Sequence, residues 1–73
     1  MSAKNYDIEL VLAARGRVLE RVATRLDLGD DGQLQGHLSA AMKRNRIPDR
    51  KRRDYALAIY APRNRRPITT WTP

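Results

Sequence analysis

The chain has no cysteine, so neither a disulfide nor a thiolate metal site can stabilise it. Its single histidine, His37, cannot form a metal site alone, and we expect neither a metal nor another cofactor. No apolar run approaches the ~18 residues of a membrane span, and the first residues lack the apolar core of a signal peptide. These absences predict a cytoplasmic protein that does not associate with membranes.

The chain of 73 residues has room for one small domain, residues 1–73, and no second one. A chain of this length buries only ~60% of the surface that its unfolded form exposes. We therefore expect marginal stability, which a homodimer contact or a bound polyanion would increase.

Positive charge is concentrated in the second half of the sequence. Residues 1–31 carry five basic and six acidic side chains, whereas residues 32–73 carry ten basic and two acidic ones. The stretch from Tyr55 to Tyr60 lies within this basic half. This stretch is too apolar to belong to a disordered tail. The pattern predicts a folded scaffold that presents a surface for a polyanion such as DNA.

One helix is expected over residues 33–45. Its apolar residues recur at helical spacing: Leu34, Leu38, Ala41 and Met42. Asp30 and Asp31 precede it and are expected to cap its free N–H groups. We interpret these carboxylates, together with Asp27, as caps rather than as catalytic groups, so we do not expect an enzyme.

The remaining elements follow from spacing and from turn residues. Helical periodicity predicts two further helices, at about residues 7–15 and 19–27, separated by a break at Gly16. The prolines at 62 and 67 bound a turn between two β-prone runs, which predicts a hairpin over about residues 53–71. A helix from Pro48 to Ala61 is the alternative for the first of these runs.

Helix, glycine break, helix, turn, helix and basic-tipped hairpin is an order that resembles the winged helix-turn-helix domain of small bacterial and phage transcriptional regulators. Four segments carry the resemblance: Ile8 to Val18, Val22 to Leu28, Leu34 to Ile47, and Arg53 to Trp71. It implies an α+β fold with three helices and a two-stranded C-terminal wing. It also implies a sequence-specific DNA-binding protein, associated with the nucleoid, that regulates transcription, with a homodimer as its expected form.

In this interpretation the helix over residues 33–45 reads the major groove, and the wing holds the backbone or the minor groove. Amide side chains pair well with adenine, and Lys reaches guanine or phosphate. The expected contacts to double-stranded DNA are Gln33, Gln35, Ser39, Lys43, Arg44, Arg50, Lys51, Arg52, Arg53, Arg63, Arg65 and Arg66.

Two features favour a different function for the same fold. Asp30 and Asp31 place negative charge where phosphate would approach, and Gly36 removes a side chain from a position that usually reads DNA. The alternatives are an interaction protein that binds and inhibits a host protein or ribonucleoprotein, and RNA binding by the basic hairpin.

Overall fold

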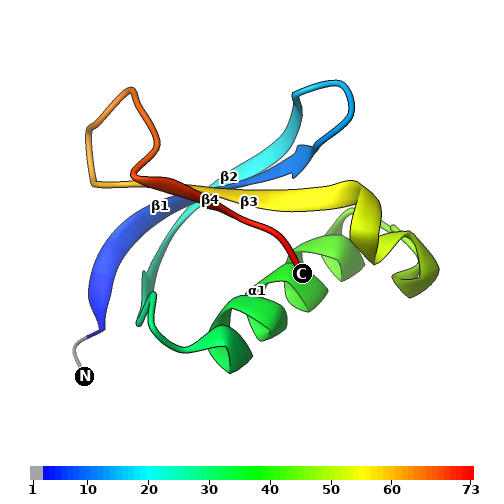
Figure 1. Ribbon diagram of the computed structural model, residues 1–73, viewed down its shortest axis with the longest axis horizontal. Helices are drawn as coiled ribbons and strands as arrows, with labels where there is room; N and C mark the ends of the chain where they lie inside the picture. The colour runs from blue at the N-terminus through cyan, green and yellow to red at the C-terminus, as the bar shows by residue number, and fades with distance from the viewer. Residues whose placement is uncertain (1–2) are drawn as a thin grey trace.

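The computed structural model describes residues 3–73, which form an α+β domain with a four-stranded sheet and one main helix (Figure 1). The elements in chain order are β1 (Lys4–Leu12), β2 (Arg17–Leu26), α1 (Asp31–Arg44), the 3-10 helix η1 (Asp49–Asp54), β3 (Tyr55–Tyr60) and β4 (Thr69–Trp71). The strand order is β2-β1-β3-β4, and every neighbouring pair is antiparallel. α1 lies along one face of this sheet (Figure 1).

The two helices expected at 7–15 and 19–27 are wrong, because these residues form the β1–β2 hairpin. Apolar and charged residues alternate along β1, so that Ile8 and Leu10 are buried in the core while Asp7 and Glu9 lie on the opposite face. Gly16 makes the hairpin turn with φ 62, a left-handed conformation that glycine adopts without steric cost. The fold is therefore not a three-helix winged helix-turn-helix.

The apolar spacing in β2 predicted a helix wrongly, because a short apolar pattern can fit both the helical period of 3.6 residues and the strand period of two. A helix would place Val22 and Ala23 on one face, but in the strand they point to opposite faces of the sheet. Val22 pairs with Ile8 on the α1 side, and Leu26 is buried on that side. The register shifts between Leu10 and Val11, which leaves Leu19 as an extra residue in β2.

α1 confirms the main features of the helix expected at 33–45. It covers residues 31–44, and Asp30 caps it by accepting a hydrogen bond from the Gln33 N–H at 3.2 Å. The predicted apolar stripe is its buried face: Leu34, Leu38, Ala41 and Met42. The stripe packs on the sheet rather than on two neighbouring helices.

The expected C-terminal hairpin exists, but it is not a wing. β3 pairs with β4 as expected, and Leu57 and Ile59 face the core. β3 also pairs with β1 over its whole length, so it is a central strand of the main sheet. Residues 53 and 54, which were expected to begin the wing, belong to η1 instead.

The core lies between α1 and the sheet; α1 and all four strands contribute side chains to it, whereas η1 has no buried residue. Its largest fully buried members are Ile8, Leu10, Leu34, Leu38, Met42, Leu57 and Ile59. Among residues 3–73 no helix is both long and apolar enough to span a membrane.

Leu38→Ala should lower the free energy of unfolding by ~2–5 kcal/mol, because Leu38 is 0% exposed at the centre of the core. Urea unfolding followed by circular dichroism measures the loss. The matched change on the exposed side of the same helix is Gly36→Ala, where a Cβ would meet nothing within 4 Å. It should instead stabilise the protein by ~1 kcal/mol. A loss below ~0.5 kcal/mol for Leu38→Ala would show that α1 does not pack on the sheet as described.

Candidate nucleic-acid interface

The β1–β2 turn and η1 meet at one end of the sheet (Figure 1). Leu12 at the end of β1 pairs with Tyr55 at the start of β3, and the Ala13 N–H donates to the Asp54 carbonyl at 3.0 Å. Antiparallel pairing thus brings Arg15 and Arg17 to the same end of the molecule as η1, although more than thirty residues separate them in sequence.

The link from α1 to η1 reaches the same end. The Ile47 N–H donates to the Met42 carbonyl at 2.9 Å, and the Arg46 N–H donates to the Lys43 carbonyl at 3.2 Å. These two bonds form a Schellman motif, which requires a left-handed residue after the helix. Arg46 fills this position with φ 57. Asn45, the residue before it, has φ −96.

Six exposed cations gather around this end, which we call the basic end: Arg15, Arg17, Arg46, Arg50, Lys51 and Arg53. Within residues 3–73 none of them lies within 4.0 Å of a carboxylate oxygen. Of the two acidic residues of η1, Asp49 is paired with Arg52, and exposed Asp54 offsets one of the six positive charges. The basic end is therefore a region of strongly positive potential.

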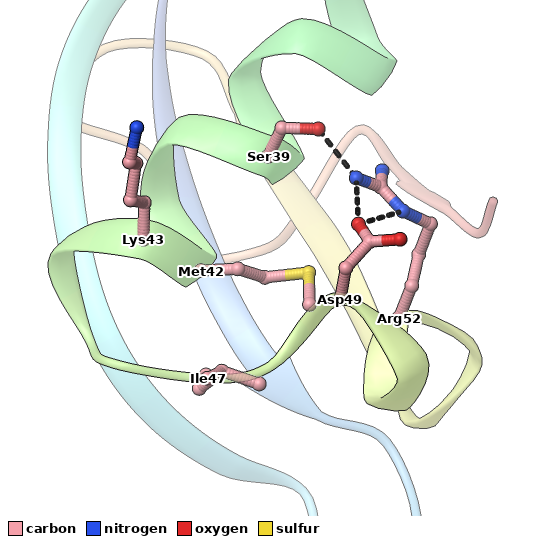
Figure 2. A pocket seen from close by; sticks show the side chains of 6 residues that line it. All are labelled: Ser39, Met42, Lys43, Ile47, Asp49 and Arg52. Atoms are coloured by element: carbon pink, nitrogen blue, oxygen red, sulfur yellow. Dashed lines mark hydrogen bonds and ion pairs between the residues drawn. The ribbon is translucent and has the colours of Figure 1, made fainter.

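Arg52 points inward from η1 and fixes η1 against α1 (Figure 2). Its Nη2 donates to Asp49 Oδ1 at 2.7 Å and to the Ser39 hydroxyl, and its Nη1 donates to Gln35 Oε1 at 2.9 Å. Beside this contact lies an open pocket of about 310 Å³, lined by Ser39, Met42, Lys43, Ile47, Asp49 and Arg52. Arg52 thus positions the basic end rather than extending it.

Most of the side chains expected to read bases from α1 have partners inside the protein. Gln33 bonds the residues that precede the helix, because its amide donates to Asp30 and its Oε1 accepts from the Asp27 N–H at 3.0 Å. Gln35 and Ser39 bond Arg52. Lys43 alone among the expected contacts on this helix is exposed and has no salt bridge or side-chain hydrogen bond within residues 3–73.

Arg44 ties α1 to β2. It donates two hydrogen bonds to Glu20, from Nε at 3.1 Å and from Nη2 at 2.6 Å, and Asn45 adds a third at 3.0 Å. These donors stabilise the carboxylate, with Arg44 the main cause, so the pKa of Glu20 lies below its ordinary value. Arg44 therefore has a structural partner and does not belong to the basic end.

The arginines expected at the wing tip lie at the opposite end of the sheet. Arg63, Arg65 and Arg66 are exposed in the loop between β3 and β4. The length of β3, about 17 Å for a six-residue strand, separates this loop from η1. The two arginine groups are therefore separate surfaces, whereas the sequence interpretation included both among the contacts to one duplex.

A polar cluster that sequence reasoning missed covers the sheet face opposite α1. Arg21 bonds Asp7 at 3.1 Å and Glu9 at 3.3 Å, and its guanidinium lies 4.3 Å from the ring centroid of Tyr60. The Tyr60 hydroxyl donates to Glu9 at 2.8 Å, and this bond raises the pKa of Tyr60. The alternation of Asp7 and Glu9 with apolar residues was the available signal. The cluster holds two carboxylates and one guanidinium, so this face does not add to the positive charge of the basic end.

His37 is half-buried on α1, as its position beside the apolar stripe indicated. Desolvation is the main cause that lowers its pKa, with the charge of Arg44 adding to the effect. Residues 3–73 contain no group of three His, Cys, Asp or Glu side chains placed to hold a metal ion.

Comparisons with protein-family models, with curated proteins and with solved structures found no match to this chain.

Arg46→Gly tests the left-handed conformation of this position at the end of α1. Glycine relieves the left-handed strain of Arg46, so the free energy of unfolding should rise by ~0.5–1 kcal/mol, measured by urea unfolding. If the variant is less stable than the parent, the Schellman geometry at the end of α1 is wrong.

Proposed function

We propose that the protein binds double-stranded DNA through the phosphate backbone, using the basic end. The observation that carries the proposal is the gathering of six exposed cations without carboxylate partners from the β1–β2 turn, the link after α1 and η1. Lys and Arg that neutralise phosphates release condensed counterions, which is the main source of sequence-independent affinity.

The contacts inside the protein favour binding with little base discrimination. Direct readout needs amide or guanidinium groups that are free to meet base edges in the major groove. Gln33 bonds Asp30 and the Asp27 N–H, and Gln35 accepts a hydrogen bond from Arg52. Phosphate contacts position a protein but carry no sequence information, so the proposal is sequence-tolerant binding rather than operator recognition.

The aromatic residues favour a duplex over single-stranded RNA or DNA. Single strands are bound on exposed aromatic platforms that stack with bases. Tyr55 is 8% exposed, Tyr60 lies against Arg21, and Trp71 is half-buried beside the core. Within residues 3–73 no aromatic side chain is fully exposed, so a single strand would find charge at the basic end but no stacking surface.

Two triple variants of equal charge test the proposal. The first changes Arg50, Lys51 and Arg53 to Gln at the basic end, and the second changes Arg63, Arg65 and Arg66 to Gln in the opposite loop. Each phosphate contact contributes ~0.9 to the slope of log K against log salt. The first variant should therefore reduce the slope by up to ~3 units, whatever the sequence of the duplex. The second should change the slope by less than ~1 unit. Fluorescence anisotropy with a labelled duplex at several salt concentrations measures both.

Equal losses from the two variants would mean that net charge, rather than the basic end, determines binding. If the parent binds no duplex at low salt, the DNA proposal is wrong. Binding of an acidic host protein would then be the function to test.

A further inference from the structure

The outer edge of β2 has no partner strand among residues 3–73. β2 is the last strand of the sheet on its side and has 10 residues, whereas the opposite edge strand, β4, has 3. A long edge exposes a row of unpaired N–H and C=O groups that can template pairing with another chain. The edge is therefore a candidate interaction surface, separate from the basic end.

The backbone groups on this edge can be assigned by alternation. The Ile59 carbonyl accepts from the Ile68 N–H, so Ile59 points its backbone groups toward β4. Because these groups alternate along antiparallel strands, Tyr60 points toward β1, its partner Asp7 points back toward β3, and Ile8 points toward β2. Val22, the partner of Ile8, then points toward β1. The groups that face outward from β2 belong to the alternate residues Arg21, Ala23 and Arg25.

Charge restricts how a second copy of β2 could pair with this edge. An antiparallel pair centred on Arg21 places Arg21 opposite itself, and one centred on Ala23 places Arg21 opposite Arg25. A pair centred on Glu20 places two carboxylates opposite each other. Like charges directly opposite destabilise a sheet. These centres are therefore disfavoured.

Centring the pair on Val22 removes every such clash. Arg21 then lies opposite Ala23, and Glu20 lies opposite Thr24. Leu19 is the extra residue of the bulge, so the regular pairing runs over residues 20–24, and Val18, which is 47% exposed in the single chain, lies beyond it. Arg21 keeps its bonds to Asp7 and Glu9, because these lie on its own sheet.

We propose that two copies of the chain associate through β2, antiparallel, with a two-fold axis at Val22, into one continuous eight-stranded sheet. Val22 and its copy form a non-hydrogen-bonded pair, with Cα atoms ~4.5 Å apart and side chains in contact on the α1 side. Arg21 and Ala23 exchange backbone hydrogen bonds with the Ala23 and Arg21 of the other copy. This proposal does not depend on DNA binding, since it uses a different surface.

The position of the axis can be tested with opposite charges at Val22, which is partly exposed. Sedimentation velocity without nucleic acid should show a dimer for the parent. Val22→Lys and Val22→Glu should each raise the dimer dissociation constant at least tenfold, because each places like charges on the axis. An equal mixture of the two variants should restore the dimer, because the axis then joins Lys to Glu.

A backbone variant gives a second readout that does not depend on charge. Ala23→Pro removes one outward N–H and leaves the β1 ladder intact, so it should abolish the dimer while circular dichroism stays unchanged. Ala23→Thr keeps the N–H and should remain dimeric. A monomeric parent at 100 µM, or a dimer that the Lys and Glu mixture fails to restore, would overturn the proposal.

Discussion

The antiparallel pairing of β1 with β3 is the constraint on which the rest of the structure depends. It joins two hairpins that are separated by α1 in the sequence, and it places Leu10 opposite Leu57 under the helix. It also fixes the ends of the molecule, because Leu12 pairs with Tyr55 and brings the β1–β2 turn beside η1. Without this pairing the core would have no central strands, and the exposed arginines of the two segments would have no common surface.

Some cations of the chain are bonded to carboxylates and connect elements, whereas those of the basic end have no carboxylate partner within residues 3–73. Arg21, Arg44 and Arg52 each bond a carboxylate and connect elements: Arg21 joins β2 to β1, Arg44 joins α1 to β2, and Arg52 holds η1 against α1. Exposed pairs of this kind contribute little to stability individually, typically ~0–1 kcal/mol. Their larger effect is on the surface potential, since they engage carboxylates elsewhere and leave Asp54 as the one unpaired carboxylate of η1 beside the six cations of the basic end.

The parts of the fold that could be predicted are those determined by local signals. α1 has a continuous apolar stripe and an Asp cap, and the run from Tyr55 to Tyr60 is bounded by a proline turn, so both were found. β1 and β2 were missed because pairing selects the strand in preference to a short helical period, and that pairing involves residues distant in sequence. The basic end was predicted only in part: Arg50, Lys51 and Arg53 were among the expected contacts, whereas Arg15 and Arg17 were not, because only the pairing of β1 with β3 brings them beside η1. Arg52 and Arg53 are adjacent, yet one is held against Gln35 and the other is exposed.

The most direct test of the account is to map the bound duplex on the protein by backbone amide chemical shifts. A ¹⁵N-labelled sample is titrated with a short duplex of random sequence, and the shift changes are plotted by residue. The account predicts changes at residues 13–17, at Arg46 and across η1, with little change at residues 63–66. Changes centred on residues 63–66 or on the helix positions Gln33 and Gln35 would contradict it.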